Sequence, residues 1–217
     1  MKKLLVFASG NKDSGGSGFQ KLVENSKSGI LKAEIVGVVS NHASGGVFNR
    51  AKELGIPFYY FAGPFTAENY QSFITKTKAD FVALSGWLKL VTGLPSDRTI
   101  NIHPGPLPKF GGSGMYGHHV HEAVLAAFQR GEIEYSEVCM HFVTDKYDEG
   151  PVFFRCLVSI FKNDTAETLA KRMNEAEHEC QSQITSLVVT GKIHWDGKDP
   201  KSLVGARTFD FRSNSLN

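Results

Sequence analysis

Two polar side chains lie at the end of a short apolar segment, residues 99–103 (TINIH), that the sequence predicts as a β-strand. Because side chains alternate along a strand, Asn101 and His103 point to the same face. An amide N–H beside an imidazole is suited to stabilising an oxyanion and to moving a proton. The prolines that follow restrict the chain, so the pattern predicts two pre-aimed catalytic side chains. The alternative is a strand-end histidine bonded to nearby backbone.

A second set of reactive groups is the acidic turn at residues 144–150 (TDKYDEG). Its three carboxylates, on Asp145, Asp148 and Glu149, lie between two predicted strands. Such a turn can direct one carboxylate into a cleft as an acid–base group. A solvated acidic turn is the alternative. The D-x-D-x-D-G spacing of a calcium-binding EF loop is absent.

The glycine-rich loop at residues 9–18 (SGNKDSGGSG) joins a predicted strand to a predicted helix. Glycines let backbone N–H groups turn toward a ligand, and a helix N-terminus favours an anion. The loop fails the Walker A pattern because Gly16 stands where lysine is required. It also fails the dinucleotide fingerprint because Lys21 replaces the last glycine. The loop is predicted to be a generic phosphate cradle, with a flexible strand–helix connection as the alternative.

Histidines also gather at the start of a predicted helix at residues 118–129. His118, His121 and Glu122 have the i, i+3, i+4 spacing that could present a metal ion on one helix face. The zinc pattern H-E-x-x-H fails because Leu125 stands at the second histidine position. The sequence therefore favours polar residues near a pocket and predicts no metal site.

The elements that must position these groups alternate in the first half of the chain. Short apolar runs predict strands at residues 4–8, 33–40, 57–61 and 80–84, and amphipathic stretches predict helices at 19–25, 47–54 and 67–76. Continuous apolar runs are typical of parallel strands that are buried on both faces. The sequence thus predicts an α/β fold, a three-layer sandwich with a mostly parallel twisted sheet and a Rossmann-like N-terminal half.

The second half of the chain changes character. Apolar strands predicted at residues 137–144 and 152–161 flank the acidic turn and indicate a hairpin. Asp164 and Glu167 have the spacing of a capping box, which predicts the start of a long helix. One face of that helix carries apolar residues at steps of three and four, namely Leu169, Met173, Ala176, Cys180, Ile184 and Leu187.

Composition limits the classes of protein to which the chain can belong. Its 217 residues are 41% hydrophobic and 21% charged, which excludes a mainly disordered chain. The 24 Lys and Arg residues against 22 Asp and Glu give a net charge of +2, which argues against nucleic-acid or anionic-membrane partners. The three cysteines form no C-x-x-C pair, which argues against a disulfide framework. No apolar run is long enough for a signal-peptide core or a membrane span, so we expect a cytoplasmic protein.

Three segments in order along the chain resemble the folate-dependent formyltransferases: residues 84–90 (LSGWLKL), 100–109 (INIHPGPLPK) and 141–152 (HFVTDKYDEGPV). The resemblance is greatest to the members that formylate glycinamide ribonucleotide in the third step of purine synthesis. It implies the formyltransferase fold and transfer of the formyl group of 10-formyltetrahydrofolate to the substrate amine through a tetrahedral intermediate, without a metal. It also implies a cis peptide bond at Leu107–Pro108.

The resemblance assigns the catalytic roles. The family's catalytic asparagine, histidine and aspartate correspond to Asn101, His103 and Asp148. Asn101 and a protonated His103 would donate hydrogen bonds to the developing oxyanion. Asp148 would raise the pKa of His103 and organise a water molecule that moves protons from the attacking amine to the leaving nitrogen.

The resemblance also implies the binding residues. Gly16, Ser17 and Gly18 would hold the ribonucleotide phosphate, and Glu177, on the polar side of the long helix, would lie near the glycinamide. The residues that would bind folate are Leu84, Trp87, Leu88, Leu90, Asn101, Val143, Thr144 and Asp148.

The sequence departs from the family pattern in two segments. The loop at residues 12–16 carries extra residues, and Gly18 replaces an expected asparagine, so phosphate binding would rest more on backbone amides. The segment at residues 111–119 is longer than usual. We expect a single domain at residues 1–193, with a nucleotide-binding half at 1–98 and a folate-binding, catalytic half at 99–193. A polar tail at 194–217 would follow, with Phe209 and Phe211 as candidate anchors.

Two other functions remain open. A sugar-nucleotide N-formyltransferase is the alternative enzyme, and a non-catalytic nucleotide-binding protein is the alternative of a different class. Relatives that formylate initiator tRNA carry a further RNA-binding domain, which the residues after 193 are too few to form. The expected partners are the two small-molecule substrates, with no nucleic acid or membrane, and the expected state is a monomer or homodimer.

Overall fold

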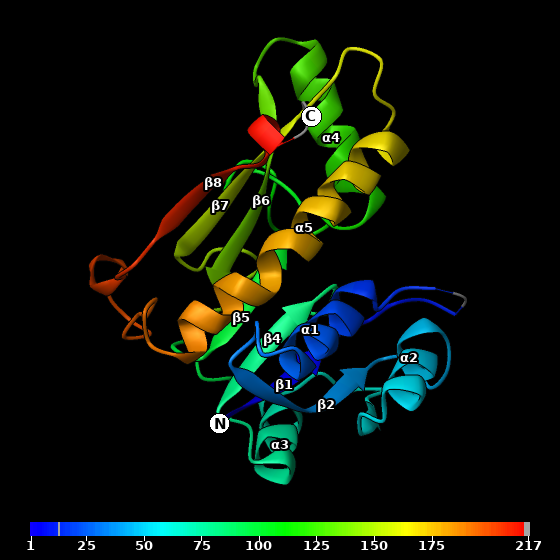
Figure 1. The fold of residues 1–217 in the computed structure, drawn as a ribbon, viewed down its shortest axis with the longest axis vertical. Coiled ribbons are helices and arrows are strands. Elements are labelled where there is room, and N and C mark those ends of the chain that lie inside the picture. The colour runs from blue at the N-terminus through cyan, green and yellow to red at the C-terminus, as the bar shows by residue number, and fades with distance from the viewer. Residues whose placement is uncertain (13, 215–217) are drawn as a thin grey trace.

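The computed structural model describes residues 1–12 and 14–214, and Figure 1 shows how its elements are layered. An eight-stranded sheet runs through the molecule in the order β3-β2-β1-β4-β5-β6-β7-β8. Its strands are β1 (Lys2–Phe7), β2 (Ala33–Ser40), β3 (Phe58–Tyr60), β4 (Phe81–Ser85), β5 (Thr99–His103), β6 (Tyr135–Phe142), β7 (Val152–Ser159) and β8 (Arg207–Asp210). The α-helices are α1 (Ser17–Lys27), α2 (Gly46–Leu54), α3 (Ala67–Thr77), α4 (His118–Gln129) and α5 (Ala166–Val189), and two short 3₁₀ turns lie at Pro200–Ser202 and Phe211–Asn214.

The N-terminal half is a parallel sheet, formed by β1 to β5, that is covered on both faces. Strand β1 shows why its last four residues are all apolar and buried. Leu4 and Val6 pack in the larger core cluster with side chains of α1 and α2, whereas Leu5 and Phe7 pack in the smaller cluster with Tyr70 of α3. Alternate residues of one strand therefore face opposite helical layers. The predicted three-layer α/β sandwich is confirmed.

The C-terminal half continues the same sheet with a change of strand direction. Strand β6 pairs antiparallel with both β5 and β7, so the predicted hairpin around the acidic turn is present. Helices α4 and α5 contact each other, and α5 crosses the molecule diagonally in Figure 1. The predicted apolar stripe of α5 is buried in the larger core cluster, with Leu187 partly buried at its end.

The start of α5 differs in detail from the predicted capping box. The N-cap residue is Thr165, whose hydroxyl accepts a hydrogen bond from the N–H of Thr168, and the hydroxyl of Thr168 accepts one from the N–H of Thr165. The carboxylate of Asp164 instead forms an ion pair with Arg172 at 2.8 Å. Asp164 and Glu167 are thus not the reciprocal pair, because a second threonine closes the box one residue later.

The C-terminal segment contributes a strand that the sequence did not reveal. Residues of β8 pair in parallel with β7 at the edge of the sheet, and Phe211 packs against the larger core cluster. Phe209, the other candidate anchor, is 39% exposed. The short, largely polar segment RTFD lacks the apolar run that identified the central strands, because an edge strand is buried on fewer sides.

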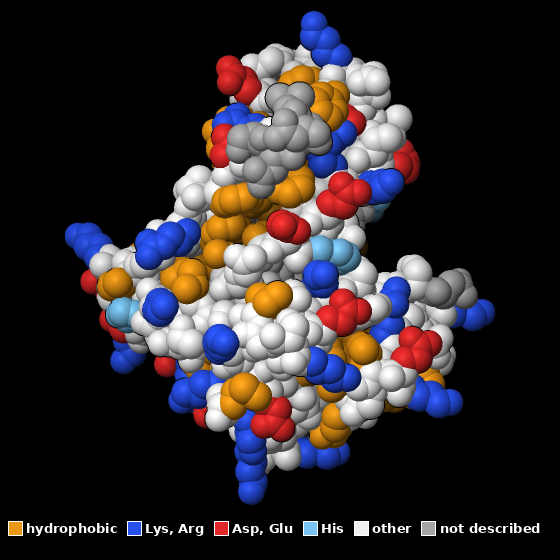
Figure 2. Space-filling view, viewed as in Figure 1, with side chains coloured by type: hydrophobic (Ala, Val, Ile, Leu, Met, Phe, Trp, Pro, Cys, Tyr) orange, Lys and Arg blue, Asp and Glu red, His pale blue; other side chains and the backbone are white. Residues whose placement is uncertain are grey.

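The surface agrees with the near-neutral composition. On the face shown in Figure 2, Lys and Arg side chains are interspersed with Asp and Glu rather than gathered in one patch. Within the described residues, no helix combines the length and apolarity that a bilayer crossing requires. The Leu107–Pro108 bond is cis, as the resemblance implies, and the Gly63–Pro64 bond is cis as well. Asp13 of the glycine-rich loop lies outside the described residues.

Candidate active site

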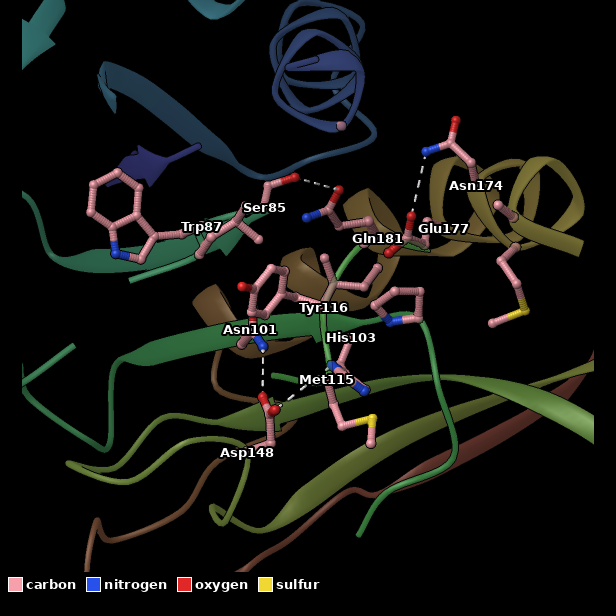
Figure 3. A pocket seen from close by; sticks show the side chains of 18 of the residues that line it. Ser85, Trp87, Asn101, His103, Met115, Tyr116, Asp148, Asn174, Glu177 and Gln181 are labelled. Atoms are coloured by element: carbon pink, nitrogen blue, oxygen red, sulfur yellow. Dashed lines mark hydrogen bonds and ion pairs between the residues drawn. The ribbon is translucent and has the colours of Figure 1, made fainter. Parts of the chain in front are cut away.

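A cavity of about 310 Å³ lies where the ends of β4 and β5 meet the start of α1 and the middle of α5. Figure 3 shows side chains from these segments converging on it. Ligands of open α/β sheets bind at the carboxyl ends of the strands, and the cavity has this position. Its wall includes the predicted catalytic residues Asn101, His103 and Asp148 and the predicted phosphate-binding residues Gly16, Ser17 and Gly18.

Asn101 and Asp148 are joined by direct contacts at one end of the cavity (Figure 3). The amide nitrogen of Asn101 lies 3.4 Å from Oδ1 of Asp148 and 3.0 Å from Nε2 of His141. Nδ1 of His141 lies 2.8 Å from the carbonyl oxygen of Phe142, which can only accept a hydrogen bond. Nε2 of His141 also lies 3.3 Å from Oδ1 of Asp148, so Asn101, His141 and Asp148 form one polar cluster.

His141 is a residue that the sequence analysis did not single out. It is 2% exposed, and it stands directly opposite Asn101 in the β5–β6 ladder. Side chains at opposite positions of an antiparallel pair lie on the same face and in contact. The register between the two strands, which local sequence does not reveal, brings this histidine to the site.

His103 is buried, and its protonation differs from the expectation. Its Nε2 lies 2.7 Å from the carbonyl oxygen of Phe110, and its Nδ1 lies 3.8 Å from Oδ2 of Asp148. Burial lowers the pKa of His103 below its ordinary value and outweighs the opposing effect of the Asp148 charge. The expected rise in pKa is therefore wrong. The resting imidazole is neutral, with a proton on Nε2 and a lone pair on Nδ1.

The acidic turn presents one carboxylate to the cavity. Asp145 and Glu149 are exposed, whereas the side chain of Asp148 is only 12% exposed and its Oδ2 accepts a hydrogen bond of 2.9 Å from the N–H of Gly112. Burial alone would raise the pKa of Asp148, but His141, His103 and the Gly112 N–H together lower it below its ordinary value. Asp148 is thus a charged group held at the cavity wall.

The glycine-rich loop leads into α1 at the other end of the cavity. Gly16 is the N-cap residue with a φ of 82°, and it offers no side chain to cap the first turn. The first N–H groups of the helix are therefore available to an anion. The hydroxyl of Ser17 lies 3.2 Å from Nε2 of His178, and Arg50 donates to the carbonyl of Gly15 at 3.1 Å.

Glu177 lies in the cavity wall on α5, together with Asn174 (Figure 3). It is half-buried, and the amide of Asn174 lies 3.4 Å from its Oε2. Burial raises the pKa of Glu177 to about 7, against a small lowering by the Asn174 hydrogen bond. A carboxyl group that titrates near neutral pH in a cavity is a candidate for a functional role.

The predicted folate residues divide into two groups. Trp87, Leu88, Asn101 and Asp148 line the cavity. Leu84 and Val143 are instead buried with Trp87 in the smaller core cluster, and neither Leu90 nor Thr144 lines the cavity. Lining residues that were not predicted as site residues include Met115, Tyr116, Met173 and Gln181.

The histidines at the start of α4 have different surroundings. His118 and Glu122 are exposed and lie 3.4 Å apart, whereas His121 is 5% exposed and lines the cavity. Burial lowers the pKa of His121 to about 4, so this imidazole is neutral. No group of three His, Cys, Asp or Glu side chains in the described ranges could hold a metal ion.

Comparisons with known proteins agree with this geometry. The family model described as formyl transferase matches residues 2–185. The chain is 36% identical over 206 residues to the chloroplastic phosphoribosylglycinamide formyltransferase of Arabidopsis thaliana, a match that covers 89% of this chain and 68% of the relative. It is 28% identical over 220 residues to the phosphoribosylglycinamide formyltransferase of Haemophilus influenzae, with coverage of 93% and 98%.

Solved structures give the same result for the fold. The phosphoribosylglycinamide formyltransferase of Coxiella burnetii, in complex with CHES, aligns with a TM-score of 0.78 and 28% identity and covers 97% of this chain and 99% of that chain. The chain spans about two thirds of the length of the plant relatives, with 68%, 66% and 65% covered. Because a family model matches most of the sequence and a solved relative shares the fold along its length, the chain belongs to the formyl transferase family.

Proposed function

We infer that this chain transfers the formyl group of 10-formyltetrahydrofolate to the amine of phosphoribosylglycinamide. One observation carries the proposal: a single cavity joins the uncapped start of α1 to the Asn101, His103 and Asp148 cluster. An acceptor with a phosphate at one end and an amine at the other fits between these two sites. Membership of the formyl transferase family and the names of the relatives support this choice.

The acceptor is positioned by the two walls of the cavity. Its phosphate lies against the N–H groups of Gly16, Ser17 and Gly18, where the helix dipole favours negative charge. Glu177, in the cavity wall on α5, contacts the glycinamide portion. The amine then faces Asn101, next to the end of β5.

The donor places its formyl carbon on the side of Asn101 that lies opposite the acceptor amine. Trp87 and Leu88 provide an apolar surface beside the cavity, and Leu88 is 40% exposed at its rim. Leu84 and Val143 pack in the same core cluster as Trp87. We assign Leu90 and Thr144 to the same donor site, at the outer edge beyond the described cavity, because both lie on segments that border Trp87 and Asp148.

The chemical step needs a hydrogen-bond donor, a base and a charge partner. A carbon–nitrogen bond forms between the acceptor amine and the formyl carbon, and the bond from that carbon to the folate nitrogen breaks. The amide of Asn101 donates to the formyl oxygen as negative charge develops on it. Neutral His103 accepts the amine proton at Nδ1, directly or through water, and Asp148 stabilises the resulting imidazolium. That proton then returns to the leaving nitrogen.

The proposed function is tested by a comparison of acceptors. We expect formyl transfer from 10-formyltetrahydrofolate to phosphoribosylglycinamide, and no comparable transfer to an amino sugar nucleotide or to methionyl-tRNA, assayed side by side. Preferred turnover of the amino sugar nucleotide would support the alternative enzyme. Nucleoside triphosphate binding without any transfer would support the non-catalytic alternative.

The pH dependence of acceptor use reports on Glu177. A pKa of about 7 means that this carboxyl is mostly protonated at pH 6 and mostly ionised at pH 8. If the ionised form binds the acceptor, Glu177→Gln loses affinity mainly at the higher pH. We expect the ratio of acceptor kcat/KM between wild type and Glu177→Gln to rise about tenfold from pH 6 to pH 8.

The acceptor amine has its own ionisation near pH 8, but it contributes equally to both proteins, so their ratio isolates Glu177. Steady-state kinetics at several pH values provide the measurement. A ratio that is constant with pH would show that the charge of Glu177 has no part in binding.

Gly18 provides a second test of the phosphate position. A Cβ built on Gly18 would lie 2.4 Å from Oγ of Ser85 and 3.2 Å from Oε1 of Gln181, so a larger side chain displaces the start of α1. We expect Gly18→Val to raise the KM for phosphoribosylglycinamide about tenfold to a hundredfold, as the loss of a charge-assisted contact would. The KM for the folate should stay nearly unchanged, and an unaltered acceptor KM would place the phosphate elsewhere.

A further inference from the structure

Gln181 is a buried amide of the cavity wall that has a hydrogen-bond donor to spare. It is 2% exposed, and it lies on α5 one turn after Glu177. Its Oε1 lies 3.4 Å from the hydroxyl of Ser85, which donates to it. No described residue accepts a hydrogen bond from its Nε2, which borders the cavity (Figure 3). This N–H opens onto the cavity and has no acceptor among the described residues, so it is available to an oxygen of a bound ligand.

The orientation of this amide is set by its surroundings. Ser85 donates to Oε1, and the first turn of α1 approaches the same oxygen closely enough that a Cβ on Gly18 would lie 3.2 Å from it. The positive end of a helix dipole favours the oxygen of an amide over its nitrogen. The oxygen of Gln181 is therefore directed to α1 and Ser85, and the nitrogen is directed to the cavity.

Gly18, Ser85 and Gln181 belong to three segments that are far apart in the sequence, and they meet at this point. Gly18 has no side chain, and a Cβ there would lie only 2.4 Å from the hydroxyl of Ser85. The glycine thus leaves the room in which Ser85 and Gln181 meet. On α5, Asn174, Glu177 and Gln181 follow at steps of three and four, so they form one polar stripe along the cavity.

We propose that Gln181 is a specificity-determining residue for the acceptor, and that its Nε2 donates a hydrogen bond to an uncharged oxygen in the part of the acceptor that connects the phosphate to the amine. The ligand class is a phosphorylated amine with a hydroxyl, ether or amide oxygen at that position. This proposal rests on the proposed function, because the acceptor must lie between α1 and Asn101. Gln181 takes no part in the chemical step.

The test compares variants at two glutamines of the same helix. Gln181→Met keeps the volume and removes the donor, and Gln181→Glu keeps an oxygen toward Ser85 and replaces the donor with a second carboxylate near Glu177. Gln183→Met is the matched control, because Gln183 is exposed two residues further along α5. Each protein is assayed with phosphoribosylglycinamide and 10-formyltetrahydrofolate varied in turn, and its Tm is recorded.

We expect Gln181→Met to lower acceptor kcat/KM about tenfold, mainly through KM, and Gln181→Glu to lower it further, while the folate KM stays within about twofold. Gln183→Met should behave as wild type. An acceptor KM within twofold of wild type in Gln181→Met, or equal losses for both substrates, would overturn the proposal. Where Gln181→Met fails to fold, Ser85→Ala replaces it, with an expected smaller rise in acceptor KM and the same criterion.

The test of Gln181 can be separated from the test of which acceptor the enzyme uses. Turnover of phosphoribosylglycinamide by the wild type tests the proposed function, whereas the ratio of variant to wild type tests Gln181. If the wild type formylates an amino sugar nucleotide instead, the proposed function fails and the same ratio is measured with that acceptor. A ratio near one would then overturn the assignment of Gln181 as well.

Discussion

Asp148→Asn is expected to lower kcat by about two to four orders of magnitude, the range for lost acid–base assistance. The substitution removes the charge that faces Nδ1 of His103 at 3.8 Å and therefore destabilises the imidazolium formed during the reaction. Asparagine suits this position for two reasons. Asp148 has a φ of 54°, which asparagine tolerates better than most residues, and an amide oxygen can still accept from the N–H of Gly112.

The measurements for this variant are kcat, the two KM values and Tm. Binding of both substrates should be largely retained, because the shape of the turn is preserved. Glu149→Gln is the matched control, since Glu149 is the exposed neighbour in the same turn and pairs with Lys146 at the surface. It should leave kcat unchanged. Near-normal turnover of Asp148→Asn would make Asp148 a structural turn residue and remove it from the mechanism.

The second large effect is expected at Asn101. Asn101→Ala removes the donor aimed at the developing oxyanion, and loss of one such donor costs about two to three orders of magnitude in kcat. Because the contact strengthens in the transition state, the KM values for both substrates should change little. The Asn101 amide also contacts both His141 and Asp148, whose Nε2 and Oδ1 atoms lie 3.3 Å apart, so Tm must be measured alongside kcat.

A control separates this effect from a general cost of removing an asparagine. Asn49 is exposed on α2, away from the cavity, and Asn49→Ala should leave kcat unchanged. If Asn101→Ala instead raised the KM for the donor with little change in kcat, the amide would bind the ground state only. The oxyanion assignment would then be wrong, although Asn101 would remain in the site.

Much of this protein is determined by short-range sequence patterns. The apolar runs of β1, β2 and β4 predict a parallel sheet buried on both faces, since successive side chains of such a run face opposite layers and both layers exclude water. The alternation in TINIH places Asn101 and His103 on one face without reference to any other segment. The periodic apolar stripe predicts α5 and its buried face. These features depend on neighbours within a few residues, so the sequence alone reveals them.

Other features depend on contacts between distant segments. The acidic turn holds three carboxylates of similar local context, and only the packed loops decide that Asp148 is buried. The β5–β6 register brings His141 to Asn101, and the pairing of β8 with β7 depends on a free sheet edge rather than on its own residues.

The protonation of His103 is decided in the same way. Burial lowers its pKa and Asp148 raises it, so the sign depends on the balance between the two, which the presence of a nearby carboxylate does not predict. The meeting of Gly18, Ser85 and Gln181 likewise needs three elements in place. The sequence determined which groups could act, whereas burial and long-range packing decided which of them face the cavity and in which charge state.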